Sequence, residues 1–261
     1  MENRQPNLKI GFLQCHIVWE DTKANLERYA RFIAEKEHNL DLFVLPEMFH
    51  CGFTMNPLKV AQSMHGEVVE WMKRIAQEHA MAVAGSVPVE EQGKYFNRFL
   101  FVRPDGEISC YDKRHLFRMA GEHNTYHGGS NQVLIEYKGW RIRPLICYDL
   151  RFPVWSRSQN NTDLIVYVAN WPASRQEAWD VLLKARAIEN QCYVLGVNRI
   201  GRDDAVDYSG GSAMIDPKGN VMSGGKSISD TIFYALADGK SLDNFRNKFP
   251  VYLDADDFSL C

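Results

Sequence analysis

The 261-residue sequence lacks the marks of several classes of protein. It has no excess of charge of one sign, because 30 basic residues are set against 33 acidic residues, for a formal net charge of -3. No block of Lys and Arg stands out, so the electrostatic footprint of a nucleic-acid-binding protein is missing. No apolar run approaches the roughly 20 residues of a membrane span, and none precedes Leu8. We therefore expect a cytoplasmic protein whose partner is a small molecule.

Disulfide motifs and linkers are also absent. The six cysteines include no CxxC pair, and a chain of this length without a signal peptide does not need disulfides, so we expect free thiols. No Gly/Ser-rich or Pro-rich segment divides the chain, which predicts a single domain over residues 1–261. The cysteines are Cys15, Cys51, Cys110, Cys147, Cys192 and Cys261.

What the sequence does contain is a repeated order of strands and helices. Short runs rich in Val, Ile, Phe and Tyr predict strands, and their unbroken apolarity indicates that both faces of a sheet are covered. Two hairpins turn at 104–106 and 217–219, each after a strand-helix-strand stretch. The chain therefore reads as two similar halves, ending near residues 113 and 226, with two sheets packed face to face and helices outside. The predicted strands are 8–15, 41–47, 81–89, 140–148, 163–170 and 192–200.

Helical periodicity separates these strands. Segments 21–37, 66–80 and 175–190 carry apolar residues at helical spacing, and Asp21 or Thr22 is a suitable N-cap for the first. Each segment predicts an amphipathic helix that packs on a sheet. In the last helix the predicted packing face consists of Ala178, Leu182, Ala185 and Ile188.

Three polar residues stand where predicted strands end. Glu47 closes "DLFVLPE", Lys113 follows the strand after the first hairpin, and Cys147 follows "RIRPLI". Each alone is more often structural: a charged strand end, a solvated turn lysine or an inert core thiol. Together they supply a base, a cation and a nucleophile, which is the set that acyl transfer requires.

These residues carry a resemblance to a known family. "LPE" with Glu47, "YDKRHLF" with Lys113 and "CYDLRFP" with Cys147, in this order, resemble the nitrilase (carbon-nitrogen hydrolase) superfamily. "ANWP" at 169–172 and "RAIENQCYV" at 186–194 match the same family in the second half. The resemblance extends over roughly residues 8 to 250.

The resemblance implies an α/β fold, a four-layer αββα sandwich of two mixed sheets with helices on the outer faces. It also implies that Glu47 is the general base, that Lys113 stabilises the oxyanion together with the backbone N–H of Tyr148, and that Cys147 is the nucleophile. Many members carry a second glutamate, and Glu122 stands in the matching region. The chemistry requires no metal and no organic cofactor.

The residues after Cys147 indicate a branch of the family. "CYDLRFPVWSR" and "YDKRHLFRMAGEH" resemble the bacterial omega-amidases, which hydrolyse the terminal amide of 2-oxoglutaramate and 2-oxosuccinamate to the 2-oxo acid and ammonia. Such an enzyme must bind a distal carboxylate, a task suited to arginine. We predict Arg118 or Arg175 for this role. Phe117, Tyr148 and Trp171 are the predicted walls of the substrate pocket.

Other interpretations of the same residues remain open. The chain could be an N-carbamoyl amino acid amidohydrolase, an aliphatic amidase, a nitrilase or a non-catalytic binding member of the family. Glu122, His123 and His127 offer metal-ligating side chains, but the HExxH order is absent. Cys51 beside His50 suggests a dyad, although adjacent side chains rarely point together. The family also implies a homodimer, with the tail 249–261 either at the subunit interface or on its own core.

Overall fold

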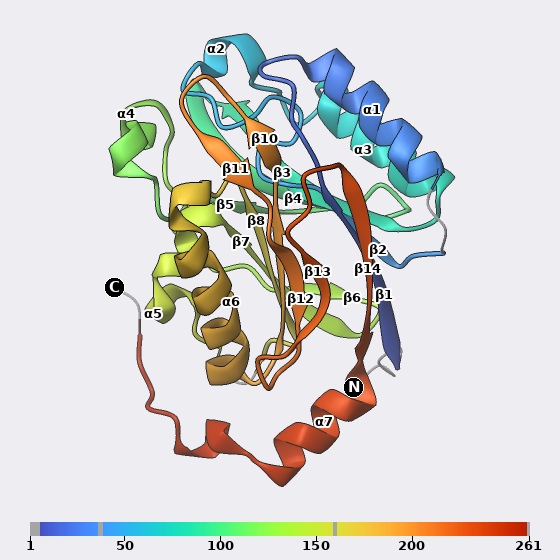
Figure 1. Cartoon of the computed structure of the whole chain (residues 1–261), viewed down its shortest axis with the longest axis vertical. Coiled ribbons are helices and arrows are strands. Elements are labelled where there is room, and N and C mark those ends of the chain that lie inside the picture. Colours follow the sequence, from blue (N-terminus) through green and yellow to red (C-terminus); the bar gives the residue numbers. More distant parts are fainter. Residues whose placement is uncertain (1–5, 36–38, 159–160, 260–261) are drawn as a thin grey trace.

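Two large sheets form the centre of the computed structural model, which describes residues 6–35, 39–158 and 161–259 (Figure 1). The first sheet has the strand order β14-β1-β2-β3-β4-β5 and the second the order β13-β12-β9-β8-β7-β6, while β10 and β11 form a separate ribbon. The strands are β1 (Asn7–Gln14), β2 (Leu42–Val44), β3 (Ala82–Glu91), β4 (Lys94–Val102), β5 (Ile108–Asp112), β6 (Ile135–Tyr137), β7 (Trp140–Ile146), β8 (Leu164–Ala169), β9 (Tyr193–Asn198), β10 (Ile200–Arg202), β11 (Asp207–Ser209), β12 (Ser212–Ile215), β13 (Val221–Gly225) and β14 (Thr231–Asp238).

Helices cover the outer faces of the two sheets (Figure 1). The pair α1 and α3 packs on the first sheet, and α6 packs on β9 of the second. Both sheets mix parallel and antiparallel pairs, so the predicted four-layer αββα sandwich is confirmed. The helices are α1 (Thr22–Ala34), α2 (Pro57–Val60), α3 (Glu67–Glu78), α4 (Glu122–Thr125), α5 (Pro153–Ser156), α6 (Gln176–Asn190) and α7 (Gly239–Lys248), with 3-10 turns η1 (Arg118–Ala120), η2 (Cys147–Arg151), η3 (Ala173–Arg175) and η4 (Val251–Asp254).

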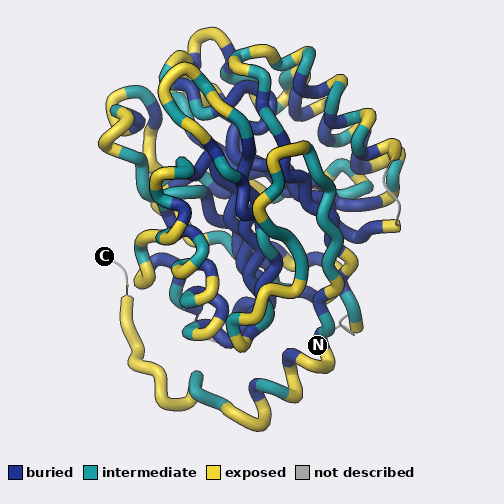
Figure 2. The backbone as a smooth tube through the Cα atoms, viewed as in Figure 1, coloured by how far each residue is buried: buried dark blue, intermediate teal, exposed yellow. Residues whose placement is uncertain are grey.

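The unbroken apolar runs of the sequence are explained by two buried clusters. Strand β2 alternates between them: Leu42 and Val44 join the core between the sheets, while Phe43 faces the cluster beneath α1 and α3. Figure 2 shows the buried backbone concentrated in the two sheets, with exposed residues on the helices and turns. A strand that is covered on both faces needs apolar side chains at successive positions.

The two predicted halves are present, and one further strand follows them in the chain and joins the first sheet. This strand, β14, pairs antiparallel with β1, in register from Asn7 opposite Asp238 to Gln14 opposite Thr231. The sequence analysis assigned no strand to this segment. The pairing protects the edge of β1, which would otherwise expose unpaired backbone N–H and C=O groups.

The predicted packing face of α6 is only partly right, because Ala178 and Leu182 pack against the core but Ile188 does not. The helix buries Trp179, Leu183 and Ala187 against the second sheet. Ile188 of the predicted face is 53% exposed, as is the neighbouring Val181. Polar Gln176, Arg186 and Asn190 share the buried side, so the polarity pattern placed the packing face too far around the helix.

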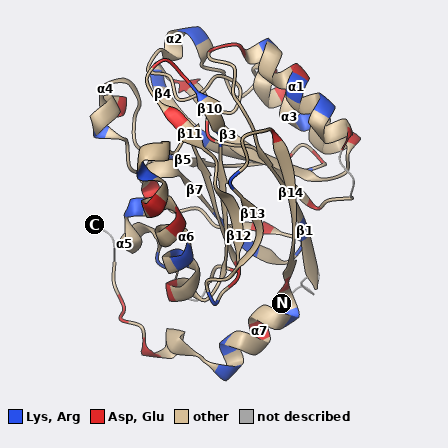
Figure 3. Cartoon of the chain, viewed as in Figure 1, with Lys and Arg blue, Asp and Glu red and all other residues tan. Residues whose placement is uncertain are grey.

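The surface agrees with the balanced composition. Figure 3 shows Lys and Arg interspersed with Asp and Glu along α1, α3 and α6. Within the described ranges, none of the helices has both the length and the apolar composition needed to cross a bilayer.

Candidate active site

Four strand ends, two from each sheet, converge at one site. Glu47 lies three residues after β2, and Lys113 directly follows β5 in the first sheet. Cys147 directly follows β7, and Asn170 directly follows β8 in the second sheet. Loops at the ends of sheet strands commonly position functional groups, because the sheets fix where each loop starts.

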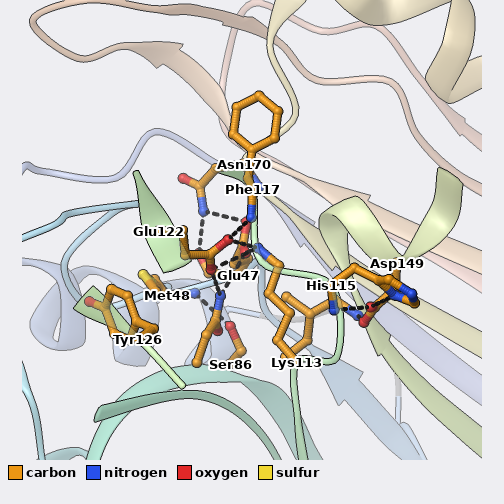
Figure 4. Close-up of polar contacts among 12 residues, drawn as sticks. Glu47, Met48, Ser86, Lys113, His115, Phe117, Glu122, Tyr126, Asp149 and Asn170 are labelled. Carbon is orange, nitrogen blue, oxygen red and sulfur yellow. Dashed lines mark hydrogen bonds and ion pairs between the residues drawn. The ribbon is translucent and has the colours of Figure 1, made fainter. Parts of the chain in front are cut away.

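The Glu47 loop is fixed by hydrogen bonds to β3. The Leu45 N–H donates to the Ala84 carbonyl at 2.7 Å, and the Met48 N–H donates to Ser86 Oγ at 2.9 Å (Figure 4). Met48 has a φ of 45°, a left-handed conformation that is costly for a residue with a side chain. These contacts turn the chain sharply and direct the fully buried Glu47 side chain between the sheets.

Lys113 bridges two buried carboxylates. Its Nζ lies 2.9 Å from Glu47 Oε1 and 2.9 Å from Glu122 Oε1, and all three side chains have no exposed surface (Figure 4). Burial alone would lower the pKa of the Lys113 ammonium, but the negative charges of Glu122 and Glu47 outweigh burial and raise it. Lys113 is therefore a fixed positive charge at the centre of the site.

Backbone and amide N–H groups complete the shell around the carboxylates. Asn97 Nδ2 donates to Glu47 Oε1 at 2.7 Å, and the Asn170 N–H donates to Glu47 Oε2 at 2.8 Å. The Phe117 N–H donates to Glu122 Oε2. The sequence analysis missed Asn97 and Asn170. Two signals could have indicated Asn170, its position at a strand end and its place in the "ANWP" motif.

Cys147 occupies a strained turn at the end of β7. Its φ of 44° lies in the left-handed region, and η2 begins at this residue. The Tyr148 N–H lies in the first turn of η2, where backbone N–H groups have no acceptor within the helix. The turn thus presents a thiol and a backbone donor side by side.

Asp149 ties this turn to the loop that carries Lys113. Its Oδ1 accepts from the His115 backbone N–H at 3.0 Å and lies 2.7 Å from His115 Nδ1. Its Oδ2 accepts from the Tyr111 hydroxyl at 2.7 Å and from the Ile146 N–H at 3.0 Å. Figure 4 shows the His115 contacts. The sequence analysis gave Asp149 no role of its own.

The environment of the resting site keeps the Cys147 thiol protonated. Burial raises the pKa of the Cys147 thiol, and the negative charge of Glu47 raises it further, against the opposing effect of Lys113. Burial also raises the pKa of Glu122, although Lys113 acts in the opposite direction. A thiol in this environment can react only when a neighbouring base removes its proton.

The site opens into a cavity of about 260 Å³. The lining includes the predicted Phe117, Tyr148, Trp171 and Arg175, whereas Arg118 is exposed and lies outside the lining. Lining residues that the sequence analysis missed are Phe53, Met119, Ala120, Arg151, Asn170, Pro172, Val206 and Tyr208.

Two arginines at the cavity wall stack on aromatic rings. The guanidinium of Arg175 lies 5.4 Å from the centre of the Phe117 ring, and that of Arg151 lies 5.1 Å from the Trp171 ring. Among the described residues, neither guanidinium has a carboxylate within ion-pair distance. The cavity can therefore accept an anionic group near either one.

The two alternative sites suggested by the sequence, a His50–Cys51 dyad and a metal site at Glu122, do not have the geometry or the environment that their chemistry requires. Contrary to expectation, His50 and Cys51 do contact each other, with Nε2 and Sγ 3.7 Å apart, but both are fully buried. Burial lowers the pKa of His50 to about 3 and raises that of Cys51, so neither group is charged near neutral pH. Glu122 of the alternative metal site instead contacts Lys113. In the described part of the chain, the search for three or more metal-ligating side chains grouped around one point finds none.

Comparison with known proteins identifies the family. The family model of carbon-nitrogen hydrolases matches residues 9–247. The omega-amidase YafV of Escherichia coli K12 is 48% identical over 257 residues, which cover 98% of this chain and 99% of that protein. A 2-oxoglutaramate amidase of Bacillus subtilis is 33% identical and covers 94% of this chain and 96% of its own.

A solved structure of a member of the same superfamily has the same fold. XC1258 of Xanthomonas campestris, a CN-hydrolase superfamily protein with an arsenic adduct in its active site, superposes with a TM-score of 0.94 at 38% identity. The alignment covers 98% of this chain and 100% of XC1258. Fold and comparisons together define a hydrolase of carbon–nitrogen bonds other than peptide bonds. The chain belongs to the carbon-nitrogen hydrolase family.

Proposed function

We propose that this protein is an omega-amidase that hydrolyses the terminal amide of 2-oxo dicarboxylate monoamides, such as 2-oxoglutaramate and 2-oxosuccinamate. The observation that carries the proposal is the Glu47–Lys113–Glu122 cluster beside Cys147, in a cavity that also presents two arginines without carboxylate partners among the described residues. Similarity to the omega-amidase YafV and to a 2-oxoglutaramate amidase supports the choice of substrate.

In the first stage, Glu47 accepts the proton of the Cys147 thiol as sulfur attacks the amide carbon. The oxygen of the tetrahedral intermediate takes up negative charge, which Lys113 Nζ and the Tyr148 N–H stabilise. The C–N bond then breaks, and the nitrogen leaves as ammonia with the proton that Glu47 returns. The acyl group remains on Cys147 as a thioester.

In the second stage, Glu47 deprotonates a water molecule that attacks the thioester carbonyl. Collapse of the second tetrahedral intermediate releases the carboxylic acid and the Cys147 thiolate, which regains its proton from Glu47. Glu122 acts through Lys113: its carboxylate lies 2.9 and 3.0 Å from the ammonium and holds it in place.

The carboxylate end of the substrate is assigned to Arg175, with Arg151 as the second candidate. Both line the cavity with Cys147, and an arginine binds a carboxylate through two parallel N–H donors. Arg118, which the sequence also suggested, lies outside the cavity lining and is the weaker candidate.

An ammonia-release assay tests the proposal. It compares 2-oxoglutaramate, 2-oxosuccinamate, glutamine, an N-carbamoyl amino acid and a simple nitrile, with Cys147→Ala as the inactive control. We expect the two 2-oxo amides to be hydrolysed fastest. Preference for the carbamoyl compound or the nitrile would instead assign the protein to another activity of the family. Hydrolysis of none of them would favour a non-catalytic role.

The protein is further proposed to be a cytoplasmic homodimer with a single domain over residues 1–261. The free thiols of Cys15, Cys51, Cys110, Cys147 and Cys192 suit a reducing compartment, while Cys261 lies outside the described residues. Val154 of α5 and Val181 and Ile188 of α6 expose apolar side chains that a partner subunit would cover. The tail from 249 exposes Phe249 and Leu253 in the same way, and its last residues, 260–261, lie outside the described ranges.

A further inference from the structure

The buried arginines differ in how their charge is balanced. Three of them pair with a carboxylate: Arg98 with Asp112 at 2.6 Å, Arg186 with Glu189 at 3.1 Å and Arg246 with Asp163 at 2.9 Å. A charge taken out of water needs such compensation, because desolvation costs several kcal/mol per ion. The other two buried arginines, Arg143 and Arg199, have no carboxylate within ion-pair distance among the described residues.

Arg199 is satisfied in another way. Nε and Nη2 donate to the carbonyls of Ile200 and Ile17, and Nη1 donates to Asn170 Oδ1. Its guanidinium also lies 4.4 Å from the centre of the Tyr208 ring. Every nitrogen of Arg199 therefore has a partner.

Arg143 lacks this compensation. It is 5% exposed, and among the described residues it donates to two neutral acceptors: the Arg157 carbonyl at 3.1 Å from Nη1, and Asn161 Oδ1 at 3.3 Å from Nη2. Its Nε is buried without a hydrogen-bond partner. Burial lowers the pKa of Arg143, which reflects a cation held without a counter-ion.

Arg143 opens onto a polar hollow with a second arginine. The hollow has a volume of about 490 Å³, and Arg143, Arg157, Asn161 and Gln132 line it together with the rings of Trp155 and Phe258. Arg157 donates to the Glu189 carbonyl and, among the described residues, likewise has no carboxylate partner. Two guanidinium groups thus share one hollow, and none of the described residues that line it has an acidic side chain.

We propose that this hollow binds a small oxyanion, a carboxylate or a phosphate, between Arg143 and Arg157. Of the five N–H groups of a guanidinium, two of Arg143 are engaged, so donors remain for the two oxygens of such an anion. A cation is excluded from a hollow that presents two positive charges. The Gln132 amide and the Asn161 amide supply further polar contacts around the rim.

The site is separate from the catalytic cavity. The two share no lining residue, and Arg143 precedes Cys147 by four positions on β7, a span of about 13 Å along a strand. Because β7 ends in the nucleophile turn, an anion on Arg143 would brace the same strand that positions Cys147. The proposal does not depend on which amide the enzyme hydrolyses.

Isothermal titration calorimetry of the full chain tests the proposal. Inorganic phosphate and glutarate are the two probes, titrated at constant ionic strength against sodium chloride as the control anion. The variants are Arg143→Met, which keeps the length of the side chain without its charge, and the less buried Arg157→Gln. The matched control is Arg202→Gln, an exposed arginine paired with Asp207.

We expect saturable binding of at least one probe to the wild type and to the Arg202 variant, and a loss of at least about tenfold in affinity in both hollow variants. Phosphate binding alone would define a phosphate site. Glutarate binding that the Arg157 variant loses would define a carboxylate site in the hollow, because glutarate held by Arg175 in the catalytic cavity would survive that change. Bound phosphate should also raise the Tm of the wild type, but not that of the Arg157 variant. Absence of binding by either probe, or equal affinity in the Arg157 variant, would overturn the proposal, even if Arg143→Met failed to fold.

Discussion

At the scale of single residues, the site combines backbone strain with buried charge. Cys147 and Met48 adopt φ angles of 44° and 45°, and each left-handed non-glycine residue costs roughly 1–2 kcal/mol. Both lie at the turns that aim the Cys147 thiol and the Glu47 carboxylate at each other. Such strain persists because the hydrogen bonds around it fix the backbone.

The role of Glu47 leads to a first prediction. Glu47→Gln keeps the shape of the side chain but cannot accept the thiol proton, so kcat/KM for 2-oxoglutaramate should fall by about 10²–10⁴-fold. Steady-state ammonia release measures this effect, and circular dichroism checks the fold. Glu107→Gln, a change at an exposed glutamate in a turn, should leave the rate unchanged. A rate for Glu47→Gln within threefold of the wild type would contradict the assigned role.

His50 predicts a pH dependence of stability. Burial lowers its pKa from 6.5 to about 3, so below pH 6.5 the unfolded chain binds a proton that the folded chain does not. The contribution of His50 to the free energy of unfolding is therefore present above pH 6.5. It is lost as the pH falls below 6.5, at about 1.4 kcal/mol per pH unit.

Urea unfolding between pH 7 and pH 4 measures the slope of the free energy of unfolding against pH. His50→Gln should remove the part of the slope that His50 contributes, whereas His65→Gln, at an exposed position, should leave the slope unchanged. Equal slopes in wild type and His50→Gln would contradict the interpretation.

At the scale of elements, the sequence predicted the strand ends that carry Glu47, Lys113 and Cys147 better than the contacts between distant elements. Apolar runs that end in a polar residue are a local signal, and three of them identified the site. The pairing of β14 with β1 joins Asn7 to Asp238, and no local pattern reveals a partner so far along the chain. The amide of Asn97 lies within β4 and could not be predicted, because an uncharged donor inside a strand has no distinctive sequence pattern, whereas Asn170 at a strand end could have been.

The turn η2 carries the next prediction. Asp149 accepts hydrogen bonds from Tyr111 and from the Ile146 and His115 N–H groups, so Asp149→Asn replaces an acceptor by a group that is partly a donor. We expect a loss of about 2–4 kcal/mol in the free energy of unfolding, together with a lower kcat. Thermal and urea unfolding measure the loss.

The matched control is Asp105→Asn, since Asp105 accepts from the Glu107 N–H in an exposed turn. It should cost less than about 1 kcal/mol. If Asp149→Asn were as mild as this control, Asp149 would not be the group that ties the Cys147 turn to the Lys113 loop.

At the scale of the whole molecule, the exposure of apolar Ile188, which the sequence placed on the packing face of α6, has a physical explanation in the proposed dimer. Periodicity finds apolar residues on a helix but not what covers them, and a subunit interface produces the same pattern as a core. Val181 and Ile188 are apolar yet 53% exposed, and in this account a partner subunit buries them.

This assignment predicts that Val181→Asp and Ile188→Asp convert a dimer into monomers, because each would place an unpaired carboxylate in the interface. Size-exclusion chromatography with light scattering gives the mass directly. Leu58→Asp, at an 85% exposed apolar residue of α2, should leave the dimer intact. A wild-type chain that is monomeric at micromolar concentration, or dimers in both α6 variants, would contradict this placement of the interface.

The central claim concerns which sulfur forms the covalent intermediate, and mass spectrometry of enzyme quenched during turnover of 2-oxoglutaramate tests it most directly. We predict an acyl adduct on the peptide that contains Cys147 and none in Cys147→Ala. An adduct on Cys51 or Cys192 instead would contradict the account.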